Sequence, residues 1–575
     1  MIYYEVSIDI MKKMTSDRTT ASERQRSMTG AEIAVDTLIE EGVDLVFGYP
    51  GGQVLDIYEE LRKKRLYRDG TLKHVLTAHE QGAAHAADGY ARASGKVGVV
   101  IATSGPGAAN LVTGIATAYL DSIPMVVITG NVPTGQIGRD SFQELDIADI
   151  TMPITKHNYI AKDINRLHEI LHEAFRIARS GRMGPVLIDI PKDVQRARCK
   201  VEYIEPGRTE LTKNRPADSE LALAVDLISN ADRPLVYCGG GATNTDAGEL
   251  VAELARRIDA PIGCSLMGLS CIPRDNPDKL GLTGMHGLAY ATEAVRRADV
   301  IVAVGTRFTD RATGSYGELV GNAKIVQLDI DPAEIDKNVT DAAYLVGDIK
   351  SSLERLLGIL EPRRHPDWRA EICRLRELSD TVTHTHDNGE PLNPYSLIDT
   401  VAQYTAGMRV VTDVGQHQMW VAQRYPFNLR RGFITSGGLG TMGFGMGAAI
   451  GASLSLGGSP VVLFTGDGSF GMNLIDVATA VGYNIPLLII IFNNRSLGMV
   501  KQWQSLLYRH TSASELDRRT DFVKVAEAFG ARGRAVHTVG ELKAALTDAL
   551  SKKRQLPFVI DCAISPDEVV EPLYE

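Results

Sequence analysis

The chain has 575 residues, of which 44% are hydrophobic and 23% charged, and its formal net charge is −10. This acidic balance argues against a role on nucleic acid or on a membrane surface, and no apolar run reaches the length of about 18 residues that a membrane span needs. Six cysteines are scattered without a CxxC pair, which argues against structural zinc and favours reduced thiols in a cytoplasmic protein.

Polar stretches divide the chain into three domains, in line with a usual domain size of about 150 residues. Residues 1–27 have mixed charge and no apolar segment, so we predict a disordered leader there. The predicted segments that follow are an N-terminal domain at 28–198, a linker at 199–218, a central domain at 219–360, a linker at 361–391 and a C-terminal domain at 392–575.

The N-terminal domain alternates apolar strands with helices. Thr29 and Glu32 have the spacing of a capping box at the start of its first helix. Repeated strand–helix alternation is typical of a doubly wound α/β domain, a parallel sheet with helices on both faces. Strands are predicted at 43–47, 97–102, 124–129 and 186–190.

Glu80 is the residue of this domain with a predicted chemical role. By default, a glutamate on a helix is a solvated surface residue. Glu80, however, begins a helix of mostly small and apolar residues directly after a strand, where a carboxyl group loses solvation. A carboxyl group in that setting is suited to proton exchange near neutral pH.

The central domain has the same alternation on a smaller scale, with apolar strands predicted at 234–238, 299–304 and 325–330. Gly239, Gly240 and Gly241 follow the first of these strands. They lack the GxGxxG spacing, so on their own they are a weak signal for dinucleotide binding. The pattern predicts a second doubly wound domain.

The C-terminal domain contains the most informative pattern. The apolar run 460–465 ends in Gly-Asp-Gly-Ser, and the run 487–492 ends in Asn-Asn. Both runs indicate buried parallel strands, so Asp467 and Asn494 are expected at one carboxyl edge of the sheet. An isolated Gly-Asp-Gly is more often a turn with an N-cap aspartate, but a carboxylate beside an amide oxygen suits Mg²⁺ and phosphate.

This pair of strand ends resembles the metal–diphosphate motif of thiamine-diphosphate enzymes. The chain is most similar to the catalytic large subunits of the acetohydroxyacid synthase (acetolactate synthase) family, from about Thr29 to Ile564. The matching motifs include Gly48-Tyr-Pro-Gly-Gly52, His79-Glu-Gln81, Ser104-Gly-Pro-Gly107, Phe142-Gln-Glu144, Gly284-Met-His-Gly287, Gly415-Gln-His-Gln-Met-Trp420, Gly440-Thr-Met-Gly443 and Leu497-Gly-Met-Val-Lys-Gln-Trp503.

The resemblance implies three doubly wound domains: pyrimidine-binding, FAD-associated and diphosphate-binding. It also implies the first common step of branched-chain amino acid biosynthesis, in which pyruvate is decarboxylated and its two-carbon unit passes to pyruvate or 2-oxobutyrate. Asp467, Asn494 and Ser496 would hold Mg²⁺, and Glu80 would hydrogen-bond the pyrimidine ring. The other residues implied at thiamine diphosphate are Val414, Gly415, Gln416, His417, Gly440, Met442, Gly468, Ser469 and Gly498.

The resemblance also implies a substrate channel and an FAD site. Without the motifs around them, Met499 and Trp503 would be core residues, and Lys162 and Arg311 solvated ones. The implied channel residues are Phe142, Gln143, Lys162, Arg311, Met499 and Trp503. The implied FAD residues are Gly239, Gly240, Gly241, Met285, His286, Gly305, Thr306, Arg307, Asp329 and Asp348, and the chain departs from the family pattern nearby at Met152 and Thr309.

Family members build each active site from two subunits, which implies a homodimer or homotetramer, and a separate small regulatory subunit is also implied. Two alternatives stay open. The chain could be another enzyme of this scaffold, such as a pyruvate oxidase or a 2-oxo-acid decarboxylase. It could also be a non-catalytic relative that binds nucleotide or flavin, although such a protein should have lost Glu80, Asp467 or Asn494.

Overall fold

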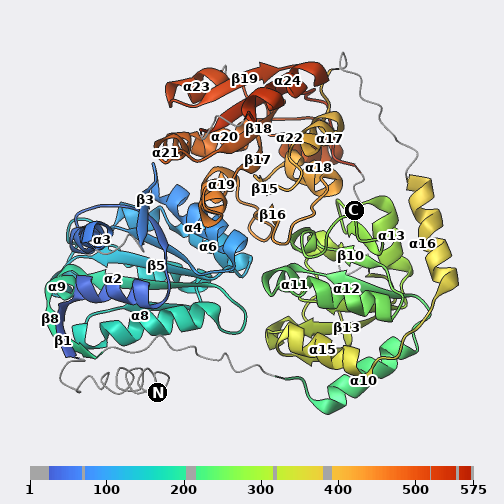
Figure 1. Ribbon diagram of the computed structural model, residues 1–575, viewed down its shortest axis with the longest axis horizontal. Helices are drawn as coiled ribbons and strands as arrows, with labels where there is room; N and C mark the ends of the chain where they lie inside the picture. Colours follow the sequence, from blue (N-terminus) through green and yellow to red (C-terminus); the bar gives the residue numbers. More distant parts are fainter. Residues whose placement is uncertain are drawn as a thin grey trace, which may run out of the picture.

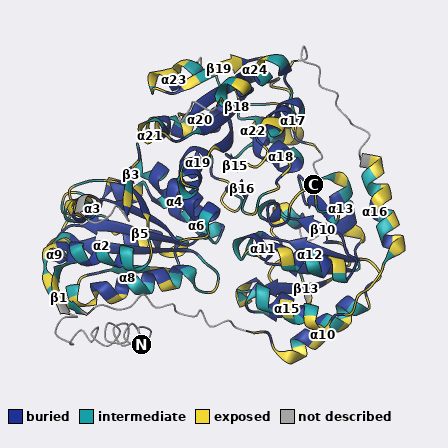
Figure 2. Ribbon diagram, viewed as in Figure 1, coloured by how far each residue is buried: buried dark blue, intermediate teal, exposed yellow. Residues whose placement is uncertain are grey.

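The computed structural model describes residues 25–67, 72–202, 215–314, 320–379, 391–517, 520–551 and 556–571. Figure 1 shows three lobes in chain order: the N-terminal domain at lower left, the central domain at lower right and the C-terminal domain above them. Buried residues follow the strands and the inner faces of the helices in each lobe (Figure 2). The predicted leader up to residue 24 and the linker parts 203–214 and 380–390 lie outside the described residues.

The N-terminal domain is a parallel six-stranded sheet in the order β3-β2-β4-β5-β7-β6. Its strands are β2 (Leu45–Tyr49), β3 (Lys73–Leu76), β4 (Gly98–Ala102), β5 (Met125–Asn131), β6 (His157–Ile160) and β7 (Pro185–Pro191). Its helices are α2 (Gly30–Glu40), α3 (Leu55–Tyr67), α4 (Glu80–Ser94), α5 (Pro106–Ala109), α6 (Val112–Leu120), α7 (Ile147–Thr151), α8 (Ile164–Arg179) and α9 (Lys192–Arg196). The predicted capping box is confirmed, because the Glu32 amide donates to Thr29 Oγ1 at 3.1 Å and the Thr29 amide to Glu32 Oε2 at 2.7 Å.

A two-stranded antiparallel ribbon corrects the predicted boundaries of this domain. It joins β1 (Gln25–Thr29) to β8 (Arg198–Glu202), with Met28 paired to Cys199. Residues 25–27 were predicted as leader and 199–202 as linker. They form strands because Met28, Cys199 and Val201 pack against the apolar core below them.

The central domain is a second parallel six-stranded sheet, in the order β11-β10-β9-β12-β13-β14. Its strands are β9 (Pro234–Cys238), β10 (Ile262–Cys264), β11 (Lys279–Leu282), β12 (Val300–Val304), β13 (Lys324–Asp329) and β14 (Asp341–Val346). Its helices are α10 (Asp218–Ser229), α11 (Gly240–Asn244), α12 (Gly248–Arg257), α13 (Ala289–Arg297), α14 (Asp310–Thr313) and α15 (Ile349–Ile359). Helix α16 (Pro366–Ser379) lies in the predicted second linker, yet its Trp368 and Ile372 are buried in the core of this domain.

The C-terminal domain is a third parallel six-stranded sheet, in the order β16-β15-β17-β18-β20-β19. Its strands are β15 (Arg409–Thr412), β16 (Phe433–Ile434), β17 (Val461–Gly466), β18 (Leu487–Asn493), β19 (Arg532–Val536) and β20 (Phe558–Ala563). Its helices are α17 (Pro394–Tyr404), α18 (Gln416–Arg424), α19 (Phe444–Ser455), α20 (Asp467–Asn473), α21 (Val477–Gly482), α22 (Gly498–Tyr508), α23 (Phe522–Ala528) and α24 (Val539–Ala549). The predicted fold of three doubly wound α/β domains is confirmed.

In each sheet the chain runs outward in opposite directions from one pair of neighbouring strands: β2 and β4, β9 and β12, and β15 and β17. Open α/β sheets bind ligands in the crevice at the carboxyl ends of such a pair, the reversal point of the sheet. The motifs singled out in the sequence follow these strands, so the topology places them where ligands are expected.

Helices α4 and α19 hold the N-terminal and C-terminal domains together (Figure 1). A Cβ atom added to Gly89 would stand 2.2 Å from the backbone oxygen of Ala448, and one added to Gly451 would stand 1.8 Å from that of Ala86. The small residues of both helices are therefore needed for this close approach. Among the described residues, no helix is both long and apolar enough to cross a membrane.

Candidate functional site

Asp467 and Asn494 lie at the carboxyl edge of the C-terminal sheet, where the sequence predicted them. Asp467 follows β17, Asn494 follows β18, and the two strands pair through Gly466 and Phe492. Both side chains are buried, at 6% and 7% exposure, and burial raises the pKa of Asp467 to about 6. The Asn494 Oδ1 atom accepts the Ser496 amide at 3.1 Å, which fixes the orientation of the side chain.

Two buried polar atoms near this edge are suited to bind a polar ligand. His417 Nε2 and Ser496 Oγ are buried and have no hydrogen-bond partner within the described chain. Burial also lowers the pKa of His417 to about 3, so its ring is neutral and can either donate or accept. Buried polar atoms are rarely left unpaired. Together with a carboxylate and an amide oxygen, these atoms fit a hydrated Mg²⁺ ion that carries phosphate groups.

The glycine-rich loop 436–443 is fixed in place by two buried side chains that sequence reasoning missed. Asp413 Oδ1 accepts the Gly443 amide at 2.8 Å, and Asn473 Nδ2 donates to the Gly443 carbonyl at 2.6 Å. Position 443 favours glycine because its φ is +87°, a backbone conformation that residues with a Cβ atom rarely adopt. Asp413 directly follows β15, just as Asp467 follows β17. Its position at the end of an apolar strand could therefore have indicated a role for Asp413 from the sequence. These contacts fix the backbone on one side of Met442.

A buried charge network from the N-terminal domain holds the other end of this loop. Asp121 accepts the amides of Gly437 and Gly438 at 3.0 and 2.7 Å, and it pairs with Arg92 at 2.8 Å. Arg92 also pairs with buried Asp88. No sequence signal marked this contact, because its partners are more than 300 residues apart.

Asp121→Asn is expected to loosen the glycine-rich loop and to destabilise the protein by about 1–3 kcal/mol. The amide group turns an N–H donor toward Arg92 or toward a loop amide, so one buried donor loses its acceptor. Thermal denaturation should show a lower midpoint than the wild type, and thiamine diphosphate should bind more weakly. The matched control is Asp548→Asn, which changes a surface ion pair with Arg532. An unchanged midpoint for Asp121→Asn would contradict the proposed tether.

A cavity of about 1040 Å³ lies where the three domains meet. Residues of the central sheet's reversal point line one part of it, and residues of the glycine-rich loop and of α22 line another. Most predicted cofactor residues of the central and C-terminal domains are thus brought together. The predicted residues that line it are Gly240, Gly241, His286, Gly305, Thr306, Arg307, Arg311, Asp329, Asp348, Val414, Gly415, Gly440, Met442, Met499 and Trp503.

The part of the cavity in the central domain fits a large polar ligand. His286 Nδ1 is buried and lacks a partner among the described residues, and burial lowers the His286 pKa to about 4. Burial raises the pKa of Asp329 to about 6. Gly305 has a φ of +58°, and a Cβ atom on it would stand 2.6 Å from Gly241, so the two loops touch directly. These groups suit a flavin nucleotide, without selecting it over other nucleotides.

Several predicted cofactor residues lie outside this cavity. Gly239 packs against Gly305, where a Cβ atom would meet the carbonyl oxygen at 2.2 Å, and Met285 Sδ lies 2.9 Å from Arg311 Nη1. Gln416 and Gly498 line a second cavity of about 1250 Å³ beside the segment 566–571. His417, Gly468 and Ser469 are buried behind the glycine-rich loop, and Ser469 Oγ donates to the Val414 carbonyl at 3.0 Å.

Four predicted residues of the N-terminal domain form a separate group. Glu80 Oε2 accepts Asn110 Nδ2 at 2.9 Å, and Gln143 packs against Gly105 in the next motif. Phe142 is 85% exposed, and Lys162 is exposed as well. None of the four lines the large cavity, as far as the described residues go. The lining of the large cavity therefore includes predicted residues of the central and C-terminal domains but none of these four.

Comparison with known proteins decides the family. Three family models match: the N-terminal TPP binding domain of thiamine pyrophosphate enzymes at residues 28–150, their central domain at 221–356 and their C-terminal TPP binding domain at 413–562. The acetolactate synthase isozyme 3 large subunit of Escherichia coli is 43% identical over 561 residues, covering 95% of this chain and 96% of that protein. The chain belongs to the acetolactate synthase large-subunit family.

Other acetolactate synthase relatives match over the same length. The probable acetolactate synthase large subunit of Methanocaldococcus jannaschii is 43% identical over 559 residues, covering 94% of this chain and 93% of that protein. The acetolactate synthase of Arthrospira platensis is 42% identical over 568 residues, covering 95% and 96%. The resemblance inferred from the motifs is thus confirmed as membership of the acetolactate synthase family.

Proposed function

We propose that this chain is the catalytic subunit of an acetolactate synthase. It decarboxylates pyruvate and transfers the two-carbon unit to a second pyruvate, giving 2-acetolactate, or to 2-oxobutyrate, giving 2-aceto-2-hydroxybutyrate. The observation that carries this proposal is the placement of Asp467 and Asn494 at the carboxyl ends of the paired strands β17 and β18, in a chain that matches an acetolactate synthase over 95% of its length.

The residues at that edge would hold Mg²⁺ and thiamine diphosphate. Asp467, Asn494 and the backbone oxygen of Ser496 would bind the ion, and His417 Nε2 is free to meet a phosphate oxygen. Thiamine diphosphate would supply a nucleophilic carbon for the carbonyl of pyruvate, and its ring would accept the electron pair left when CO₂ departs. Met442 is held beside the cavity by the loop that Asp413 and Asp121 fix, so it would support the bound coenzyme.

Glu80 would exchange a proton with a ring nitrogen of the coenzyme. Asn110 holds one carboxyl oxygen of Glu80, and Gly107 leaves the other accessible, since a Cβ atom there would stand 3.2 Å from Glu80 Oε1. The family resemblance implies that each site is built from two subunits, so we propose that Glu80, which does not line the large cavity of its own chain, serves the site of a second copy. The exposed apolar side chains of Phe142, Met152 and Tyr508, at 85%, 63% and 65% exposure, suit such an interface.

The substrate would occupy the part of the cavity between Arg311, Met499 and Trp503. The Arg311 guanidinium offers paired donors to the carboxylate of a 2-oxo acid. Phe142, Gln143 and Lys162 would close the channel from the second copy. Water is excluded by the apolar side chains around the reacting carbon, which keeps the two-carbon unit for transfer rather than release.

Trp503→Leu is expected to shift the preferred acceptor from 2-oxobutyrate toward pyruvate by about 10-fold, within the range for a changed apolar contact. The wide indole surface favours the extra methyl group of 2-oxobutyrate. Competition between the two acceptors, followed by chromatography of the products, measures the ratio. Tyr404→Leu, at the exposed end of α17 and outside both cavities, is the matched control. A ratio unchanged by Trp503→Leu would leave Trp503 with a packing role alone.

FAD would lie along the central-domain part of the cavity, beside Gly240, Gly305, His286 and Asp329. Since the net reaction transfers carbon without oxidation, FAD would act mainly as a structural group. The name "large subunit" of the relatives implies a small partner, and we extend that to this chain. A cytoplasmic location agrees with its six cysteines, which are all free.

Product identification tests the proposed function. The full-length protein is incubated with pyruvate, thiamine diphosphate and Mg²⁺, with and without FAD, and 2-acetolactate is detected as acetoin after acid decarboxylation. We expect acetoin from pyruvate alone and 2-aceto-2-hydroxybutyrate when 2-oxobutyrate is added. Oxygen consumption with flavin reduction would indicate an oxidase instead, and free acetaldehyde a decarboxylase.

A further inference from the structure

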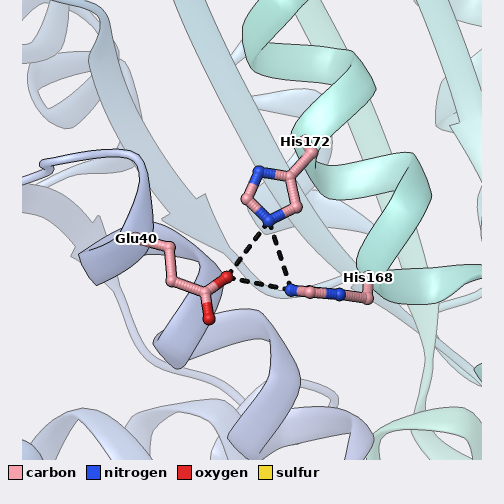
Figure 3. Close-up of side chains that lie close together, drawn as sticks. All are labelled: Glu40, His168 and His172. Atoms are coloured by element: carbon pink, nitrogen blue, oxygen red, sulfur yellow. Dashed lines mark hydrogen bonds and ion pairs between the residues drawn. The ribbon is translucent and has the colours of Figure 1, made fainter. Parts of the chain in front are cut away.

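Three side chains of the N-terminal domain that do not line the large cavity converge between helices α2 and α8. Glu40 ends α2, while His168 and His172 stand one turn apart on α8 (Figure 3). The Glu40 Oε2 atom lies 2.9 Å from His168 Nε2 and 3.1 Å from His172 Nε2. The two Nε2 atoms lie 3.2 Å apart. One oxygen and two nitrogens thus face a single point.

The size of this triangle matches that of a tetrahedral zinc site. Zinc binds imidazole nitrogen and carboxylate oxygen at about 2.0–2.1 Å, so two ligand atoms of a tetrahedron lie about 3.3 Å apart. The three separations here, 2.9, 3.1 and 3.2 Å, are close to that value. Two histidines four residues apart on a helix, with one glutamate, are also a common zinc ligand set.

The group around the triangle has the form of an outer shell for a bound metal. His172 Nδ1 lies 2.6 Å from Glu41 Oε1, and Glu41 is in turn paired with Arg179. A carboxylate only accepts, so the His172 proton stays on Nδ1 and the lone pair of Nε2 points into the triangle. A cation, either a proton or a metal ion, is needed between His172 Nε2 and Glu40 Oε2, which lie 3.1 Å apart.

We propose that Glu40, His168 and His172 bind a Zn²⁺ ion, with water as the fourth ligand. The three side chains are 15%, 11% and 13% exposed, so the site is sheltered but open to water on one side. The ion would join α2 to α8, two helices that pack on one face of the sheet. The cysteine pattern argued against structural zinc, but this ligand set uses no cysteine. None of the three proposed ligands lines the large cavity, although Arg179, which pairs with Glu41, does.

Metal binding to the full-length protein tests the proposal. The protein is freed of metal with a chelator, supplied with Mg²⁺ and thiamine diphosphate, and titrated with Zn²⁺ by calorimetry, with the bound zinc counted by elemental analysis. We expect the wild type to bind about one Zn²⁺ per chain. His172→Gln and Glu40→Gln should each bind zinc at least 10- to 100-fold more weakly. The control His157→Gln, which alters an exposed histidine of the same domain, should bind zinc as the wild type does. Zinc should raise the thermal midpoint of the wild type and leave that of His172→Gln unchanged.

Co²⁺ as a probe keeps the proposal testable if a variant does not fold. In the wild type, Co²⁺ should give the intense visible bands of a tetrahedral site without sulfur charge transfer, and Zn²⁺ should abolish them. Equal zinc affinity in the wild type and in folded His172→Gln would overturn the proposal. So would sulfur charge transfer, or the absence of tetrahedral bands in the wild type. In that last case a shared proton, rather than a metal, holds the three side chains together.

Discussion

Glu80→Gln is expected to lower kcat by about 10²–10⁴-fold while thiamine diphosphate still binds in the presence of Mg²⁺. In the unsubstituted protein, Asn110 Nδ2 donates to Glu80 Oε2 at 2.9 Å. Glutamine has the same shape as glutamate and keeps an oxygen that can accept this hydrogen bond. What it loses is the ability to exchange a proton with the coenzyme. The reaction should therefore slow at the step that generates the nucleophilic carbon, with little effect on cofactor affinity.

Steady-state kinetics with pyruvate and titration with thiamine diphosphate measure the two effects separately. Exchange of the coenzyme's reactive-carbon proton with deuterated water, followed by NMR, reports the affected step directly. Glu169→Gln, which changes an exposed glutamate of α8, is the matched control and should behave as the wild type. Near-normal turnover in Glu80→Gln would show that this carboxyl group does not relay the proton.

Asp467→Ala is expected to abolish Mg²⁺-dependent retention of thiamine diphosphate. Asp467 is the one acidic member of the proposed metal-ligand set, and all three members, Asp467, Asn494 and Ser496, are buried. Without it, the ion has only neutral protein ligands, which Mg²⁺ exchanges readily for water. Affinity for the coenzyme should fall by 100-fold or more, and activity with it.

The measurement is the amount of coenzyme that remains bound after dialysis in buffer with Mg²⁺. Asp548→Ala, on α24 of the same domain, serves as the control because its carboxylate forms a surface ion pair with Arg532. Circular dichroism confirms that Asp467→Ala is folded. Retention equal to that of the wild type would rule out Asp467 as the metal anchor.

The strands that sequence reasoning found are those buried on both faces. The apolar runs of β4, β5, β17 and β18 are almost entirely buried, so their composition alone marks them. Edge strands β6 and β19 escaped because they are partly exposed and contain polar residues. The ribbon of β1 and β8 escaped for another reason, since only their alternate residues touch the core.

The sequence predicted the site where it depends on strand ends, and failed where it depends on long-range contacts. Asp467 and Asn494 follow apolar strands, so their meeting could be anticipated. The contact of Asp121 with Gly437 and Gly438 could not, because no local pattern records which helix end meets which loop. Likewise, no local pattern tells that Glu80 is absent from the lining of the large cavity.

Mixing two inactive variants tests most directly whether Glu80 and Asp467 act together across two copies of this chain. Glu80→Gln and Asp467→Ala chains carry different affinity tags, are co-expressed, and the mixed dimer is isolated through both tags. If each site takes Glu80 from one copy and Asp467 from the other, one of two sites is intact, and activity should return to about half of the wild-type value per dimer. Activity no higher than that of the two parent variants would contradict a shared site.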